Sequence, residues 1–163
     1  MVKTPVFKGS CTAIVTPFTQ TGIDYERLEK NIDFQYENGS AAILVNGTTG
    51  EAATQSPCEL NETLRQAVKF NGGRMKLIAG IGSNNTQSAL INAENAKSAG
   101  ADAVLMVTPY YNKTSQKGLI EHFSYVADRV DIPIILYNVP SRTGISITPE
   151  TYKALSQLSL IHI

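Results

Sequence analysis

Cysteine and long apolar runs are scarce in this sequence of 163 residues, and tryptophan is absent. The two cysteines, Cys11 and Cys58, are too few for a disulfide framework and lie in no Cys/His cluster, so neither a disulfide-rich scaffold nor a zinc site is expected. No stretch approaches the roughly 20 apolar residues that cross a bilayer, and residues 1–10 have no apolar signal-peptide core. These absences predict a cytoplasmic protein with no metal and no membrane partner.

An excess of charge of one sign is also missing. The 14 Lys and Arg residues balance the 14 Asp and Glu residues, so the formal net charge is zero and no nucleic-acid partner is expected. No Gly-x-Gly-x-x-Gly motif follows the first apolar run, which argues against a dinucleotide, and no cofactor is predicted. A hydrophobic fraction of 42% and a charged fraction of 17% are typical of a folded globular domain.

A regular alternation of short apolar runs and longer amphipathic segments is present instead. The apolar runs begin about 30 residues apart, the length of one βα unit, and cover residues 12–16, 41–45, 76–80, 103–107 and 132–137. Helices are predicted after them at residues 25–38, 57–70, 86–99 and 115–128, with a fifth beginning near residue 149. Because the runs are continuously apolar, they favour parallel strands in a sheet covered on both faces.

Two architectures are built from such units: an open doubly wound sheet and a (β/α)8 barrel of the TIM type. Polar loops follow the carboxyl ends of the predicted strands, and a barrel keeps its chemistry in a ring of such loops. The barrel is therefore favoured, although a complete one needs about 250 residues. The predicted fold class is α/β, a truncated TIM (β/α)8 barrel with its first five βα units, either an unusual half-barrel or a fragment.

The loop Gly47–Glu51 lies between a predicted strand and a predicted helix, and it is a candidate for binding a small carboxylate. Its two glycines allow a tight turn that brings backbone N–H groups close to a ligand, and the hydroxyls of Thr48 and Thr49 lie between them. The alternative is an ordinary βα turn.

Two tyrosines and an arginine follow later strands. Tyr111 and Tyr137 are candidates for a proton relay, or for packing at the rim of the barrel. Arg142 is placed in a rigid loop ended by a glycine, where its guanidinium either forks onto a carboxylate or is simply solvated. His122 falls in the middle of a predicted helix and is expected on its surface. Hydroxyls, tyrosines and one arginine together indicate organic-acid chemistry without a metal.

Taken in order, the polar motifs at residues 13–18, 47–51, 108–112 and 137–144 resemble those of the dihydrodipicolinate synthase and N-acetylneuraminate lyase family of (β/α)8 aldolases. The resemblance covers about residues 7–155. The threonine pair and Arg142 are similar to the dihydrodipicolinate synthase branch, which condenses pyruvate with L-aspartate 4-semialdehyde in lysine biosynthesis. The alternatives are aldolases of the same family that act on N-acetylneuraminate or on a 2-keto-3-deoxy sugar acid.

The resemblance implies a role for each candidate. Pyruvate forms a Schiff base with a lysine on the sixth strand, and Thr49 and the backbone N–H groups of its loop hold the pyruvate carboxylate. Tyr137 carries the proton, and Thr48 and Tyr111 complete a relay, with Tyr111 reaching into a neighbouring subunit of a homo-oligomer, a dimer or a tetramer. Arg142 receives the carboxylate of the semialdehyde. No cofactor or metal takes part.

The sequence departs from this family near its end. The Schiff-base lysine is expected just beyond the last residue, and none of the nine lysines present takes its place, so the chain alone is expected to be inactive. A half-barrel that binds a keto acid without turnover, or one that only dimerises, is the alternative. Residues 1–157 are predicted to be the N-terminal part of the barrel. Residues 158–163 resemble a translated sequencing adapter and are interpreted as a non-native tail, or else as a divergent hydrophobic strand.

Feedback inhibition by L-lysine is expected to be weak in the full-length enzyme. Inhibited members of the family bind lysine with histidines and a carboxylate. Here residues 55–60 contain no histidine, and Ser88 occupies the place of that carboxylate.

Overall fold

A computed structural model describes residues 4–162 of the chain. Within that range, six parallel strands form one sheet, and their order in the sheet is their order in the sequence. The strands are β1 (Cys11–Ala13), β4 (Ala42–Val45), β5 (Lys76–Gly80), β6 (Ala103–Val107), β7 (Ile134–Tyr137) and β8 (Ile161–His162). A doubly wound sheet reverses its strand order, whereas a barrel adds each strand beside the previous one. The predicted truncated barrel is therefore confirmed.

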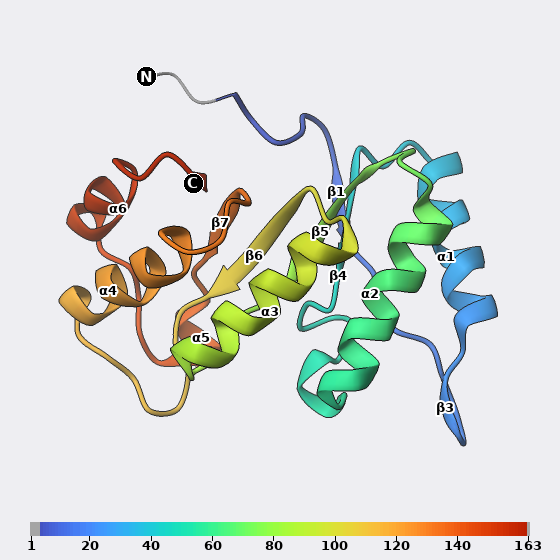
Figure 1. Cartoon of the computed structure of the whole chain (residues 1–163), viewed down its shortest axis with the longest axis horizontal. Helices are drawn as coiled ribbons and strands as arrows, with labels where there is room; N and C mark the ends of the chain where they lie inside the picture. The colour runs from blue at the N-terminus through green and yellow to red at the C-terminus, as the bar shows by residue number, and fades with distance from the viewer. Residues whose placement is uncertain (1–3, 163) are drawn as a thin grey trace.

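Helices connect successive strands and follow one another in an arc along one side of the sheet (Figure 1). They are α1 (Tyr25–Glu37), α2 (Pro57–Asn71), α3 (Thr86–Ala99), α4 (Gln116–Ala127) and α6 (Pro149–Leu155). All five were predicted to within one residue at the ends that were assigned. Shorter elements were not predicted: the hairpin of β2 (Phe18–Thr19) and β3 (Gly22–Ile23), the 3-10 turn η1 (Ala52–Thr54) and the four-residue helix α5 (Pro140–Thr143).

Helix α2 shows how the sequence sets the ends of a helix. The Ser56 hydroxyl accepts a hydrogen bond from the Glu59 backbone N–H, and the Glu59 carboxylate accepts one from the Ser56 N–H at 2.8 Å. This capping box satisfies two of the unpaired N–H groups at the helix start. The Glu59 carboxylate also accepts a hydrogen bond from the Ser56 hydroxyl at 2.7 Å, and the bonds from the Ser56 N–H and hydroxyl together lower the pKa of this carboxyl. The helix ends at Gly72, whose φ of 56° is left-handed.

Successive residues of each strand point to opposite faces of the sheet, and each face has its own apolar cluster. Ile43, Val104 and Met106 face the helices and belong to the large core. The other face has a smaller cluster of Ala42, Ile78 and Ala103, against which Val6 and Phe7 of the N-terminal segment pack. The helix face of the sheet is thus covered as predicted, whereas on the other face Leu44, Leu105 and Ile135 are only partly buried, so full cover of both faces is not confirmed within the described residues.

Strand β8 lies in the segment that was interpreted as a non-native tail. Ile161 and His162 pair in parallel with Ile134 and Ile135, and the Ile161 side chain is buried. The structure thus gives these residues the place of a sixth strand, while their non-native origin stays a prediction. Ile163, and the first three residues of the N-terminal stretch, lie outside the described residues.

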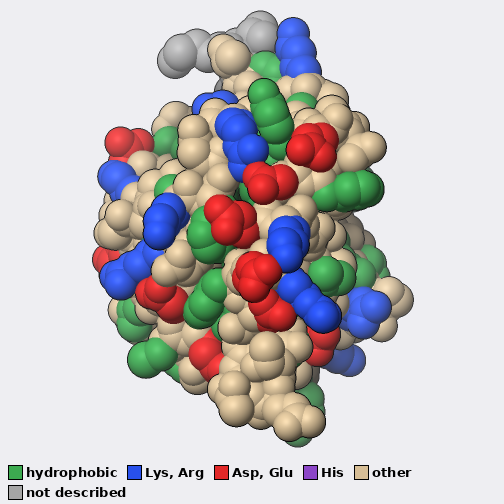
Figure 2. Space-filling view, turned by 90° about the vertical axis from the view of Figure 1, so that its right-hand side faces the viewer, with side chains coloured by type: hydrophobic (Ala, Val, Ile, Leu, Met, Phe, Trp, Pro, Cys, Tyr) green, Lys and Arg blue, Asp and Glu red, His purple; other side chains and the backbone are tan. Residues whose placement is uncertain are grey.

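Acidic and basic side chains are interspersed over the α1 side of the molecule (Figure 2). Several form ion pairs there, including Lys30 with Glu26 and Arg74 with Asp33, each at 2.6 Å. No helix within residues 4–162 is both long and apolar enough to cross a membrane.

Candidate active site

The five predicted site residues all lie at the carboxyl edge of the parallel sheet. Thr48 and Thr49 follow β4, Tyr111 follows β6, and Tyr137 is the last residue of β7. The strands are in register there, with Val107 beside Tyr137, so their following loops share one edge. Arg142 lies in α5, directly after β7. The sheet therefore gathers on one edge residues that are about 95 positions apart in the sequence, as expected for barrel loops.

The loop that carries Thr48 and Thr49 is bounded by two residues with left-handed backbones. Asn46 has a φ of 57° and Glu51 a φ of 54°, a conformation that asparagine tolerates and that is unfavourable for glutamate. Within the loop, the Glu51 N–H donates to the Thr48 carbonyl at 3.1 Å. Both threonine side chains are exposed, and among residues 4–162 neither hydroxyl has a hydrogen-bond partner. They are free to bind a ligand.

A buried polar network, which the sequence did not reveal, lies under this loop. The Gly50 carbonyl accepts hydrogen bonds from the Thr16 hydroxyl at 2.7 Å and from the Gln55 amide at 2.8 Å. The Gln55 carbonyl in turn accepts a hydrogen bond from Thr63 at 3.3 Å. All three side chains are buried. Thr16 belongs to a polar motif noted in the sequence, whereas Gln55 and Thr63 gave no sign of burial.

The backbone under the loop is packed so closely that glycine is required. A Cβ atom on Gly80 would lie 2.1 Å from the Asn46 carbonyl oxygen, which is far inside van der Waals contact. The Asn46 side chain is itself buried, and its amide donates to the Leu60 carbonyl at 2.9 Å. Strand β5 and helix α2 therefore hold the start of the loop from two sides.

Tyr111 points away from the chain. Its side chain is 92% exposed, and its φ of 67° is left-handed. The neighbouring Asn112 amide donates to the Asn84 carbonyl at 3.1 Å, which ties the loop after β6 to the loop after β5.

No hydrogen bond joins Thr48, Tyr111 and Tyr137 anywhere in the described chain. β4 and β7 are three strand spacings apart, roughly 14 Å along the sheet. That spacing follows the curved sheet and is not the direct distance between the side chains, so the relay stays a prediction.

Arg142 was placed by the sequence in a loop, and this prediction is wrong in detail because residues 140–143 form one helical turn. Pro140 begins the turn, and Gly144 ends it with a left-handed φ of 69°. The Arg142 guanidinium is exposed and has no ion-pair partner within the described residues. It is available to a carboxylate that approaches the edge of the sheet.

Lysines lie at both edges of the sheet. Lys76 begins β5 at the amino edge, where it pairs with Asp102 at 2.6 Å. Lys113 follows β6 at the carboxyl edge, and its side chain lies against Gly144. In residues 4–162, no group of three or more His, Cys, Asp and Glu side chains is placed to hold a metal ion.

The prediction that His122 lies on a helix surface is wrong. Its side chain is only 5% exposed, and its Nδ1 atom is 2.8 Å from the Thr86 hydroxyl of α3. Leu119, Phe123 and Val126 are fully buried on the same face of α4, so the helical spacing of four residues could have revealed the burial. Burial lowers the pKa of His122 to about 4.

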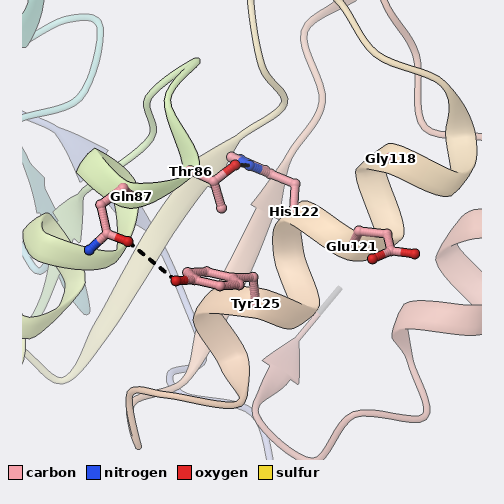
Figure 3. Close-up of a pocket in the computed structure, with 6 residues that line it drawn as sticks. All are labelled: Thr86, Gln87, Gly118, Glu121, His122 and Tyr125. Atoms are coloured by element: carbon pink, nitrogen blue, oxygen red, sulfur yellow. Dashed lines mark hydrogen bonds between the residues drawn. The ribbon is translucent and has the colours of Figure 1, made fainter.

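A hollow of about 390 Å³ lies beside His122, between α3 and α4 (Figure 3). Thr86 and Gln87 line it from α3, and Tyr125, whose hydroxyl donates to Gln87 at 3.3 Å, lines it from α4. This hollow belongs to the helical layer and contains none of the five predicted site residues.

Parallel strands in sequential order, covered by helices and with polar loops at the carboxyl edge, define the (β/α) barrel class of proteins. The family model described as "Dihydrodipicolinate synthetase family" matches residues 6–162. The chain belongs to this family.

Individual relatives are similar over nearly the whole chain. The 4-hydroxy-tetrahydrodipicolinate synthase of Thermoanaerobacter sp. (strain X514) is 53% identical over 94% of this chain and 52% of the relative. The crystal structure of dihydrodipicolinate synthase from Aquifex aeolicus is 48% identical with a TM-score of 0.91, over 94% of this chain and 53% of that one. The pyruvate complex of the Acinetobacter baumannii enzyme is 42% identical with a TM-score of 0.92, over 94% and 53%. The chain thus spans about half the length of the relatives it matches.

Proposed function

We propose that the full-length protein is a Schiff-base-forming lyase that condenses pyruvate with L-aspartate 4-semialdehyde in lysine (diaminopimelate) biosynthesis. The observation that carries the proposal is the free carboxylate-binding chemistry at one edge of the sheet: two threonine hydroxyls and one guanidinium, all exposed and without partners in the described chain. Relatives at about 50% identity are named 4-hydroxy-tetrahydrodipicolinate synthase, and one solved relative contains pyruvate.

The Gly47–Gly50 loop would bind the carboxylate of pyruvate. The Thr49 hydroxyl and the backbone N–H groups of the loop donate to the carboxylate, and these charge-assisted hydrogen bonds are stronger than neutral ones. The loop is held in place before a ligand arrives, because Thr16, Gln55 and Asn46 fix it from beneath. A fixed loop loses little conformational freedom on binding.

Proton transfer would be shared among Tyr137, Thr48 and Tyr111. A Schiff base forms when a lysine amine attacks the keto carbon of pyruvate and water leaves, and the departing oxygen needs a proton. Tyr137, at the end of β7, supplies that proton in this proposal, and Thr48 and Tyr111 connect it to solvent. The exposed, outward Tyr111 would reach the site of a second subunit, so the full-length protein would be a homo-oligomer, a dimer or a tetramer.

Arg142 would select the second substrate. Its free guanidinium, on the turn after β7, can form two parallel hydrogen bonds with the carboxylate of the semialdehyde. An acceptor without that carboxylate would lose this pair of bonds.

The chain by itself would lack the Schiff-base nucleophile. Lys76 lies at the opposite edge and is paired, and Lys113 rests against Gly144 in a loop. We therefore expect no condensing activity from residues 1–163 alone.

Borohydride trapping tests this assignment. The chain and a full-length relative are each incubated with pyruvate and borohydride, and their intact masses are measured. One pyruvyl adduct is expected on the relative and none on the chain. An adduct on Lys113 or another lysine of the chain would show that the nucleophile is present. Calorimetric titration with pyruvate then separates a keto-acid-binding half-barrel, which releases or absorbs heat, from one that does not bind.

A further inference from the structure

Gln55 places a buried amide directly beneath the Gly47–Gly50 loop. Its side chain is 8% exposed, and both ends of the amide are used. The Nε2 atom donates to the Gly50 carbonyl at 2.8 Å, and the Oε1 atom accepts from the Thr63 hydroxyl at 3.3 Å. The amide thus connects the end of the loop to the interior of α2.

This connection restrains a loop whose backbone is unfavourable. Asn46 and Glu51, at the two ends of the loop, are both left-handed, and a left-handed glutamate persists only where the surrounding structure imposes it. Asn46 is held by its bond to Leu60. At the other end, two donors converge on the Gly50 carbonyl, the residue directly before Glu51, and fix the orientation of that peptide.

We propose that Gln55 is a positioning residue, which holds the Gly47–Gly50 loop in the shape that presents Thr49 and its neighbouring N–H groups to a carboxylate. The inference rests on the proposed function, because it takes the loop to be the pyruvate site. Gln55 does not touch the ligand; it acts through the Gly50 peptide.

The chemistry of the amide explains why an apolar residue of similar size does not substitute. Leucine at position 55 would leave the Gly50 carbonyl with the Thr16 hydroxyl as its one donor. It would also remove the carbonyl that accepts from the Thr63 hydroxyl, which is fully buried. Buried polar groups that lose a hydrogen bond are costly. The Gly50 peptide would therefore shift toward other partners, and the loop would become more mobile.

Amide hydrogen exchange measured by NMR on the Gln55→Leu chain tests the proposal. The reporters are the N–H groups of Glu51 and Ala52, which donate to Thr48 and Gly47 inside the loop. Their protection should fall by about five- to tenfold, the loss of one net hydrogen bond. Protection in the sheet, at Ile81 and Val104, should be unchanged. Equal loss at all four sites, or none in the loop, overturns the proposal.

Gln66→Leu is the matched control, because Gln66 lies in α2 and, within residues 4–162, its amide bonds to Glu62 alone, at 2.7 Å. It should leave the protection of the loop as it is.

Gln55→Glu tests whether the hydrogen bond that residue 55 donates to the Gly50 carbonyl is what holds the loop. An ionised carboxylate accepts from Thr63 but cannot donate to the Gly50 carbonyl, whereas a protonated carboxyl can do both. Burial favours the protonated form. Loop protection factors, corrected for intrinsic exchange, should therefore rise toward the wild-type value as pH falls from 8 to 5.5. A loop protection that is independent of pH would count against the proposal.

Pyruvate titration, followed at the Thr49 amide resonance, separates the positioning role of Gln55 from the proposed binding of pyruvate by the loop. If the wild-type chain binds pyruvate, Gln55→Leu should weaken binding at least fivefold, and an unchanged affinity overturns the positioning role. If the wild-type chain does not bind pyruvate, the proposed function of the loop fails in this chain. The exchange comparison would still decide whether Gln55 holds the loop.

Discussion

The buried imidazole of His122 should make the stability of the fold depend on pH. In the folded chain, desolvation lowers its pKa from an ordinary 6.5 to about 4, whereas the unfolded chain titrates near the ordinary value. Between these two values the unfolded chain binds the proton and the folded chain does not, so acid favours unfolding. The contribution of neutral His122 is fully present above about pH 6.5 and is lost as pH falls toward 4.

The size of the effect follows from the shift. Each pKa unit corresponds to about 1.36 kcal/mol, so the whole lowering of the His122 pKa would contribute roughly 3 kcal/mol to the free energy of unfolding. Part of it is screened, because the ring borders a hollow that is open to solvent and because the exposed carboxylate of Glu121 lines the same hollow. We expect a loss of about 2 kcal/mol in the free energy of unfolding.

Urea denaturation at pH 7.5, 6.5, 5.5 and 4.5 measures this loss. The control is His122→Gln, which keeps a polar partner for Thr86 but does not titrate in this range. Subtracting its pH profile removes the contribution of carboxyl groups such as Glu59. A difference between the two proteins that stays constant over the range would refute the argument that His122 is neutral and desolvated.

Four further outcomes are expected. Ser56→Ala removes the capping box of α2 and should lower the free energy of unfolding by about 1 kcal/mol, measured by urea denaturation; an unchanged midpoint would contradict the cap's role. Gly80→Ala should destabilise the chain by more than about 3 kcal/mol, because its Cβ meets the Asn46 carbonyl oxygen, and normal thermal unfolding would show that the loop can yield. In the full-length protein, Arg142→Ala should raise the KM for the semialdehyde at least tenfold more than that for pyruvate, and equal effects would remove Arg142 from acceptor binding. Ser88, on the first turn of α3, offers no carboxylate to an ammonium, so half-inhibition of the full-length enzyme by L-lysine should need more than about 1 mM; tighter inhibition would mean that another carboxylate binds the lysine.

The long elements could be predicted from the sequence because their physical causes are local. Helical spacing and caps such as Asp24 and Ser56 predicted the helices, and continuous apolar runs predicted the strands. The prediction of the first strand was less accurate, because the strand was expected at residues 12–16 but occupies Cys11–Ala13. Ile14 makes the last hydrogen bond to β4, and the chain then turns toward the hairpin. Elements of two to four residues, such as β2 and α5, are too short to show a period.

The positions of Thr48, Thr49, Tyr111, Tyr137 and Arg142 at one edge also followed from the sequence, since parallel strands bring their carboxyl ends together. The support beneath them did not. Thr16 and Gln55 are 39 residues apart, and their contact exists only because β1 and β4 are neighbours in the sheet. A polar residue after a loop gives no local indication that it is buried, so Gln55 could be recognised only in three dimensions.

A steady-state assay of the full-length protein tests whether it condenses pyruvate with the semialdehyde. Pyruvate is supplied with L-aspartate 4-semialdehyde in one series, and in two others the protein is given N-acetylneuraminate or a 2-keto-3-deoxy sugar acid to cleave. The condensation with the semialdehyde should have the highest kcat/KM. Thr49→Val should lower that kcat/KM by roughly a hundredfold, a loss of about 3 kcal/mol, because the pyruvate carboxylate binds more weakly. Faster cleavage of either sugar acid, or full activity in Thr49→Val, would contradict these predictions.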